Sequence, residues 1–318
     1  MSSPPVSQRS LDGRLRHLLT LDGLPASMLE TLLGAAEAMV PQSKSGTDLR
    51  ASLAGRTVCT LFFEASTRTR GSFHLAATRL GADVLGFDVH ASSARKGETA
   101  LDTMRTLEAM GVDCFVVRHA DDGAVAELAA GARSETSFIN AGDGRNAHPT
   151  QGLLDMLTLR QRKGPDFSNL KVLIVGDILH SRVARSDLHA LRALGAGEIR
   201  VCAPAALLPD DDTLQGCRVF DSLDEAVYRA DAVMMLRLQR ERMDEGLVPS
   251  LEGYFMDYGL DARRLGLAAP DAVVLHPGPM NRGVEISDEV ADGAQSAILQ
   301  QVGNGVAVRM AVLQALLG

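Results

Sequence analysis

Strand-like apolar runs alternate with helix-period segments along most of this chain, and the alternation occurs in two separate series. The first series has strand patterns at Thr57–Phe63, Asp83–Phe87, Cys114–Arg118 and Ser137–Asn140, with helical patterns at 67–80, 99–111 and 122–132. The second has strand patterns at Lys171–Val175, Ile199–Ala203, Ala232–Met235 and Ala272–Leu275, with helical patterns near 182–194, 223–229 and 261–267. Such alternation is typical of parallel sheets, so we predict an α/β fold of two sheets, each with helices on both faces.

The length of 318 residues suits about two domains. A helical pattern at 148–162 ends at Lys163-Gly164-Pro165, where we expect the hinge. We predict a first domain of residues 1–150 with 300–318, and a second domain of residues 151–299. The segment Gly305–Leu317 is apolar on most sides, which predicts a final helix that packs back on the first domain.

The N-terminal region contains one further helical pattern. Apolar residues recur at helical spacing from Leu24 to Val40, and Pro41 with the polar stretch to Asp48 is expected to end that helix. Residues 1–16 are rich in Ser, Pro and Arg, and we expect them to lack fixed structure until a partner docks on them.

Charge and hydropathy narrow the class of protein. With 32 Lys and Arg against 40 Asp and Glu the net charge is −8, which disfavours nucleic acid or an anionic membrane surface as a partner. No apolar run approaches the roughly 20 residues that span a bilayer, and the first residues lack the apolar core of an export signal. We expect a cytoplasmic protein.

The four cysteines do not suggest a metal or a disulfide framework. Cys59, Cys114 and Cys202 lie inside apolar runs and Cys217 lies near another, so we expect reduced and mostly buried thiols. None forms a C-x-x-C pair, and no two histidines have metal-ligand spacing. We expect neither a metal nor a cofactor.

The sharpest local signal is Phe62-Phe63-Glu64-Ala65-Ser66-Thr67-Arg68-Thr69-Arg70. A buried strand ends there, and hydroxyl and guanidinium side chains follow where a helix begins. The first turn of a helix has N–H groups without intrahelical acceptors and the positive end of the helix dipole. Open α/β sheets bind ligands at the carboxyl ends of their strands, so this loop predicts a phosphate site. The alternative is that Ser66 only caps the helix.

The same stretch resembles the carbamoyl-phosphate loop of the transcarbamoylase family, and other motifs of the family follow in order. They are Lys96-Gly97-Glu98-Thr99, Val117-Arg118-His119, His148-Pro149-Thr150-Gln151, Val175-Gly176-Asp177 with Ser181-Arg182, the segment 236–242, and His276-Pro277-Gly278-Pro279. The resemblance covers residues 17 to 317 and is strongest to the branch that uses aspartate. It implies transfer of a carbamoyl group from carbamoyl phosphate to the α-amino group of L-aspartate, which gives N-carbamoyl-L-aspartate and phosphate. This is the committed step of de novo pyrimidine (UMP) synthesis.

The resemblance also implies roles for individual residues in binding carbamoyl phosphate. Ser66, Thr67, Arg68 and Thr69 hold the phosphate. Thr69, Arg118 and His148 point at the carbonyl oxygen, where they stabilise the tetrahedral oxyanion. Gln151 and the backbone of Pro277 and Gly278 hold the carbamoyl NH₂ group. No general base is evident, and the leaving phosphate can accept the proton.

For the second substrate, the resemblance assigns Arg182 to the α-carboxylate of aspartate and Arg237 with Gln239 to the β-carboxylate. Ser92 and Lys96 belong to a loop that reaches the neighbouring subunit's site, Lys96 being a catalytic and aspartate-binding residue there. This implies a homotrimer with shared active sites. Glu64 is implied to bridge to Arg182 and Arg242 in the closed form of the enzyme.

Three other interpretations compete with this one. The run Val172–Asp177 resembles the first strand of a dinucleotide-dependent dehydrogenase, but the glycine fingerprint fails after Gly176. An ornithine-specific transcarbamoylase is the nearer alternative, although Arg237 and Gln239 suit an acidic acceptor. The third is a catalytically silent homologue. The N-terminal extension and the segment 175–186 also resemble a bacterial subgroup that associates with a dihydroorotase-like chain, which makes that chain a candidate partner.

Overall fold

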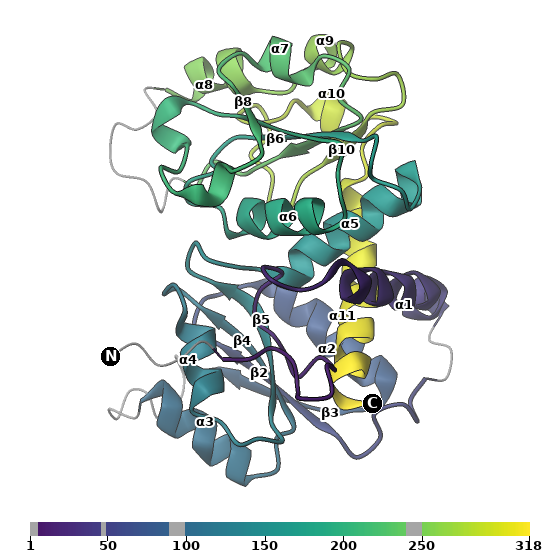
Figure 1. Ribbon diagram of the computed structural model, residues 1–318, viewed down its shortest axis with the longest axis vertical. Helices are drawn as coiled ribbons and strands as arrows, with labels where there is room; N and C mark the ends of the chain where they lie inside the picture. The colour runs from purple at the N-terminus through teal and green to yellow at the C-terminus, as the bar shows by residue number, and fades with distance from the viewer. Residues whose placement is uncertain (1–5, 46–48, 89–98, 240–249) are drawn as a thin grey trace. The chain divides into compact units, whose positions relative to one another are not determined.

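The computed structural model describes residues 6–45, 49–88, 99–239 and 250–318, and the chain divides into two compact units (Figure 1). Unit 1 comprises Met1–Leu153 and Gly303–Gly318, and unit 2 comprises Leu154–Val302. Each unit contains one five-stranded sheet, and every pairing between its strands is parallel. The predicted fold class is confirmed.

The sheet of unit 1 has the order β1-β5-β4-β2-β3. Its strands are β1 (His17–Leu18), β2 (Thr57–Phe62), β3 (Asp83–Asp88), β4 (Cys114–His119) and β5 (Ser137–Asp143). Its helices are α1 (Ala26–Ser45), α2 (Thr67–Leu80), α3 (Ala100–Ala109), α4 (Ala124–Ala130) and the C-terminal part of α11 (Ile298–Leu317). Apolar residues of β2, β4 and β5 pack with α3 and α4 into one buried cluster that includes Cys59, Phe115 and Phe138.

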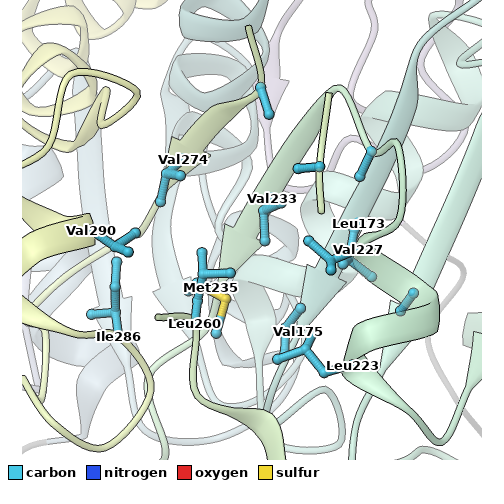
Figure 2. Close-up of a cluster of buried hydrophobic side chains, with 14 of the residues drawn as sticks. Leu173, Val175, Leu223, Val227, Val233, Met235, Leu260, Val274, Ile286 and Val290 are labelled. Carbon is cyan, nitrogen blue, oxygen red and sulfur yellow. The ribbon is translucent and has the colours of Figure 1, made fainter. Parts of the chain in front are cut away.

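The sheet of unit 2 has the order β10-β9-β6-β7-β8. Its strands are β6 (Lys171–Val175), β7 (Glu198–Cys202), β8 (Arg218–Phe220), β9 (Ala232–Met235) and β10 (Val273–Leu275). Its helices are the greater part of α5 (Pro149–Lys163), α6 (Arg182–Ala193), α7 (Leu223–Val227), α8 (Leu251–Tyr258), α9 (Ala262–Leu265) and α10 (Asp288–Ala291). Figure 2 shows side chains of β6, β9 and β10 packed against α7, Leu260 and Ile286 in a buried cluster.

Three sequence predictions differ from the structure near the helices. Helix α1 continues through Pro41 to Ser45, although a proline removes one backbone hydrogen bond and crowds the preceding turn; only the last turn of the helix follows it. Helix α11 begins at Ile298 rather than Gly305, and it packs on α1 as expected of the final helix. The division between the units lies within α5, after Leu153, whereas Lys163-Gly164-Pro165 only ends that helix.

The N-terminal segment also departs from expectation, because residues 6–16 have defined structure. Backbone N–H groups of Arg16 and His17 donate to the carbonyl of Gln8 at 2.8 and 3.1 Å. The Gln8 side-chain oxygen accepts from the N–H groups of Leu19 and Thr20 at 2.6 and 2.9 Å. This segment leads directly into β1, which pairs with β5 at the sheet edge.

The cysteine prediction is confirmed. All four thiols are free, and Cys59, Cys114 and Cys202 are buried while Cys217 is half-buried. Burial raises the pKa of both Cys59 and Cys202 to about 12, so these thiols stay protonated and unreactive at neutral pH. None of the helices described here combines the length and the apolar character needed to cross a bilayer.

Candidate active site

The predicted phosphate loop lies between β2 and α2. Ser66 stands at the N-cap of α2 with an extended backbone, but its side chain makes no capping hydrogen bond. Thr67 and Arg68 are exposed in the first turn, and Thr69 is buried. The first N–H groups of a helix have no intrahelical acceptor, and Ser66 does not satisfy them here. The loop therefore offers backbone and hydroxyl donors together with a guanidinium to an anion.

Arg118 lies at the carboxyl end of β4, next to this loop. In the ladder between β2 and β4, Phe62 aligns with Arg118, which brings the chain after β2 beside it. One guanidinium nitrogen of Arg118 donates to Glu64 Oε1 at 2.9 Å, and another donates to the carbonyl of Ala141 at 3.2 Å. The Arg118 side chain is only 12% exposed. Contacts on two sides thus fix the direction of its positive charge.

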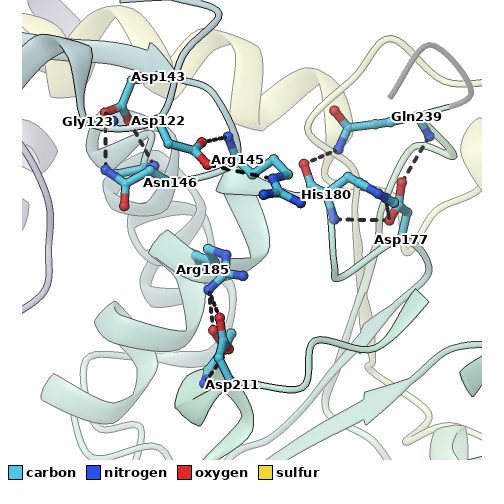
Figure 3. A network of polar contacts seen from close by, with 12 residues as sticks. Asp122, Gly123, Asp143, Arg145, Asn146, Asp177, His180, Arg185, Asp211 and Gln239 are labelled. Atoms are coloured by element: carbon cyan, nitrogen blue, oxygen red, sulfur yellow. Dashed lines mark hydrogen bonds and ion pairs between the residues drawn. The ribbon is translucent and has the colours of Figure 1, made fainter. Parts of the chain in front are cut away.

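The turn after β5 is held by a buried carboxylate. Asp143 accepts hydrogen bonds from the backbone of Gly123 and Ala147 and from the side-chain amides of Asn140 and Asn146, at 2.8–3.1 Å. Figure 3 shows part of this cluster, with Asp122 and Arg145 beside it. The chain then reaches His148, whose carbonyl accepts the first backbone hydrogen bonds of α5. His148 and Gln151 are both buried.

These predicted residues lie at the ends of three adjacent strands. Ser66–Thr69 follow β2, Arg118 lies at the end of β4, and His148 and Gln151 follow β5. The carboxyl ends of parallel strands meet at one edge of a sheet, so the structure gathers these predicted residues at a single edge of unit 1. Ser92 and Lys96 follow β3, but they lie outside the described residues, as does Arg242.

In unit 2, the buried side chains of Asp177 and His180 lie in the loop after β6, and hydrogen bonds connect this loop to Gln239 in the loop after β9 (Figure 3). Asp177 accepts from the His180 ring at 2.8 Å and from the backbone N–H of Gln239 at 3.4 Å. The Gln239 side chain donates to the carbonyl of His180 at 3.0 Å. Desolvation raises the pKa of Asp177, although its hydrogen bonds to His180 act in the opposite direction.

These contacts position the predicted aspartate-binding residues. Arg182 begins α6 and is buried, and the Ser181 hydroxyl before it caps the helix by accepting from the N–H of Ala184 at 3.1 Å. Arg237 is half-buried two residues after β9. Strands β6 and β9 are neighbours, so the start of α6 with Arg182 and the loop with Arg237 and Gln239 lie at the same edge of the second sheet.

A third loop, after β10, lies at the same edge of the unit 2 sheet and is held by hydrogen bonds of the His276 ring. The N–H of Gly278 donates to His276 Nδ1 at 2.8 Å, so that nitrogen carries no proton. The proton is therefore on Nε2, which donates to Glu285 Oε1 at 3.2 Å. Both side chains are fully buried. Pro277 and Gly278 are half-buried immediately after His276, with Gly278 at a φ of 62°.

Sequence reasoning missed the residues that hold these loops. Asp177, His180, His276 and Glu285 fall in or near the recognised motifs, but the sequence does not show which side chains they meet. The only feature of the sequence that marks these four residues is that they are polar and lie near apolar strands. Among the described residues, no cluster of three or more His, Cys, Asp or Glu side chains could hold a metal ion.

Comparison with known proteins defines the class. Residues 16–161 match the aspartate/ornithine carbamoyltransferase carbamoyl-P binding domain, and residues 168–316 match the Asp/Orn binding domain of the same enzymes. The chain belongs to the aspartate/ornithine carbamoyltransferase family.

Two groups of relatives refine the comparison. The aspartate carbamoyltransferase catalytic subunit of Xanthomonas campestris pv. campestris is 69% identical over 311 residues, which cover 98% of this chain and 99% of that protein. The protein of the same name from Stenotrophomonas maltophilia is 67% identical over 315 residues, with 98% and 99% covered.

Solved structures agree in fold. Aspartate transcarbamoylase from Trypanosoma cruzi in complex with N-(phosphonacetyl)-L-aspartic acid superimposes with a TM-score of 0.86 at 33% identity, covering 99% of this chain and 98% of that one. Ornithine carbamoyltransferase from Pyrococcus furiosus gives 0.85 at 28% identity, covering 95% and 97%. The fold is thus common to both acceptor specificities.

Proposed function

We propose that this protein transfers the carbamoyl group of carbamoyl phosphate to the α-amino group of L-aspartate, releasing N-carbamoyl-L-aspartate and phosphate. The observation that carries the proposal is the identity of 69% to aspartate carbamoyltransferase catalytic subunits over nearly the whole chain. Identity to ornithine carbamoyltransferases of similar fold is only 27–28%, which favours aspartate as the acceptor.

Unit 1 binds carbamoyl phosphate in this proposal, and unit 2 binds aspartate. The uncapped start of α2, with Ser66, Thr67, Arg68 and Thr69, takes the phosphate dianion. Attack of the amine on the carbamoyl carbon places negative charge on the carbonyl oxygen, and Thr69, Arg118 and His148 stabilise it. Removing one such donor typically costs on the order of 3 kcal/mol of transition-state stabilisation.

The buried contacts around Arg118 support this role, because a donor that is already oriented needs little reorganisation as charge develops. Gln151 and the backbone at Pro277–Gly278 hold the carbamoyl NH₂ group. The amine's proton passes to the leaving phosphate, so positioning of the two substrates supplies much of the rate.

Aspartate carries two carboxylates, which need two separate cations. Arg182 binds the α-carboxylate, while Arg237 and Gln239 bind the β-carboxylate. The link from Gln239 to His180 supports this assignment, because it fixes the β9 loop against the loop that precedes Arg182. Ornithine ends in an ammonium group, which Arg237 would repel.

The assembly and cellular context complete the proposal. The active unit is a homotrimer in the cytoplasm, and Ser92 and Lys96 of one subunit complete the neighbour's site. A dihydroorotase-like chain is the candidate partner, with residues 1–16 as a regulatory segment that responds to nucleotides. Co-purification of the two chains, and nucleotide inhibition before and after deletion of residues 1–16, test these points.

A substrate comparison tests the activity. The purified chain is given carbamoyl phosphate with either L-aspartate or L-ornithine, and phosphate release is followed. We expect turnover with aspartate and a kcat/KM for ornithine lower by roughly 10⁴-fold or more, since buried charged groups would be mismatched. Equal or better use of ornithine would refute the proposal, and no turnover with either would favour a silent homologue.

A further inference from the structure

Two buried carboxyl groups meet in the interior of unit 2, away from the loops described above. Asp187 lies in the middle of α6 and Asp155 lies on α5, and both are fully buried. They are close enough that the Asp155 side chain acts directly on the Asp187 carboxyl. Two ionised carboxylates at that distance would repel strongly in a low-dielectric interior.

The surroundings of the two carboxyl groups differ. Both oxygens of Asp187 are buried, and no donor among the described residues reaches either of them. Asp155, by contrast, accepts from the Gln301 side-chain amide at 2.6 Å, which favours its ionised form. Desolvation and the charge of Asp155 raise the pKa of Asp187 well above its ordinary value. In the described part of the chain, Asp155 is the charged group that acts on this carboxyl.

Hydrogen bonds connect this pair of carboxyl groups to the loop after β10. Gln301 uses its amide nitrogen on Asp155 and its oxygen to accept from the backbone N–H of His276 at 2.9 Å. His276 in turn orders Gly278 through its ring. A series of hydrogen bonds therefore connects Asp155, the neighbour of Asp187, to the backbone that is proposed to hold the carbamoyl group.

We propose that Asp187 is a positioning residue, which stays protonated at neutral pH and donates a hydrogen bond to Asp155. The shared proton fixes α6 to α5 and orients Gln301, and Gln301 holds the loop that begins at His276. The link to catalysis rests on the proposed function, whereas the shared proton does not.

Substitution by asparagine separates the proton from the hydrogen bond. In Asp187→Asn the amide donates to Asp155 without needing a proton, whereas Asp187→Leu has a similar volume and no donor. We expect Asp187→Asn to keep kcat/KM for aspartate within about twofold, and Asp187→Leu to lower it on the order of tenfold or more through misplacement of the loop. A loss in Asp187→Asn as large as in Asp187→Leu would overturn the proposal.

Two readouts without substrate test the proton itself. Infrared spectra of the full chain at neutral pH should contain the C=O band of a protonated carboxyl, and Asp187→Asn should lack it. If that variant does not fold, Asp155→Asn should also lack the band, because its amide then supplies the donor. Absence of the band from the unmodified protein would overturn the proposal and would leave the proposed activity untouched.

The pH dependence of unfolding supplies the second readout. The folded state keeps a proton that the unfolded state releases above about pH 4, so stability should fall as pH rises from there toward the raised pKa. The unfolding constant should rise up to about tenfold more per pH unit in the unmodified protein than in Asp187→Asn.

Asp143→Asn is the matched control, because Asp143 is equally buried but accepts four hydrogen bonds. It should lose stability without removing the infrared band. Identical pH slopes in the unmodified protein and Asp187→Asn would overturn the proposal.

Discussion

At the scale of single residues, close packing between two loops leaves little room for a side chain at Gly176. Its φ is +120°, and an added Cβ would lie 3.1 Å from both the carbonyl oxygen of Leu236 and the hydroxyl of Tyr254. Leu236 begins the loop that carries Arg237 and Gln239. The absence of a side chain at Gly176 therefore helps to set the position of the loop that is proposed to bind the β-carboxylate.

Substitution of Gly176 by alanine should both strain the fold and displace that loop. We expect a loss of about 1–3 kcal/mol in the free energy of unfolding and a higher KM for aspartate. Chemical denaturation and steady-state kinetics measure the two effects. Gly34→Ala is the control, because Gly34 lies in helix α1 with open space around it. It should be stabilising by up to about 1 kcal/mol, and an equal loss there would contradict our explanation.

His17 should make the stability of unit 1 depend on pH. Its ring is fully buried in β1 and its Nδ1 accepts from the N–H of Phe138 at 3.1 Å, so it must be neutral. Burial lowers the pKa of His17 from 6.5 to about 4. The unfolded chain therefore gains a proton first as pH falls, and stability present above about pH 6.5 is lost progressively down to about pH 4.

The loss over that range should amount to about 3 kcal/mol. Urea denaturation at a series of pH values measures this loss. His17→Gln should lower the number of protons taken up on unfolding in this pH range by about one. An unchanged slope in that variant would refute the assignment to His17.

At the scale of elements, two helices begin differently although both start after a serine. Ser66 leaves the start of α2 uncapped, whereas the Ser250 hydroxyl accepts from the N–H of Gly253 at 2.9 Å and caps α8. An uncapped helix start costs stability that a bound anion can restore. The contrast favours a ligand-binding role for Ser66 over the capping role that the sequence left open.

The two serines should respond in opposite ways to alanine. Ser66→Ala should leave the free energy of unfolding nearly unchanged and raise the KM for carbamoyl phosphate. Ser250→Ala should cost about 1 kcal/mol of stability. Thermal unfolding and substrate titration distinguish them, and a stability loss in Ser66→Ala as large as in Ser250→Ala would restore the capping interpretation.

The sequence predicted the central elements well and the edges poorly, for a physical reason. Strands β6 and β9 and helix α2 have the predicted bounds, because long apolar runs and turn residues define them locally. Strands β1 and β8 were missed, since they have only two and three residues, too few to show a strand pattern, and lie at the edges of their sheets.

The candidate site shows the same limit. The sequence placed Ser66, Arg118 and Arg182 at element ends, where local pattern suffices. It could not pair Asp177 with Gln239 or Asp155 with Asp187, because those contacts depend on tertiary packing between distant segments.

At the scale of the whole molecule, the proposed activity needs residues from both units. Glu64 is proposed to join Arg182 and Arg242 when substrates bind, and in the structure it accepts from Arg118 at 2.9 Å. The expected bridge stays a prediction, since Arg242 lies outside the described residues.

Glu64→Ala tests that bridge. We expect the KM for aspartate to rise far more than the dissociation constant for carbamoyl phosphate, because the bridge would act after the first substrate is bound. Steady-state kinetics and direct carbamoyl-phosphate titration give the two values, with Glu127→Ala on α4 as a control for loss of a carboxylate. Equal weakening for both substrates would reject the bridge.

The path of the chain through the two units has a consequence for biogenesis. Unit 1 includes α11 from Gly303 onward, and Val308, Val312 and Leu313 of that helix are buried. The ribosome makes this part of α11 only after it has made all of unit 2. During synthesis, unit 1 therefore exposes the apolar face that α11 later covers until unit 2 has been made. Chaperones that bind nascent chains would bind this face.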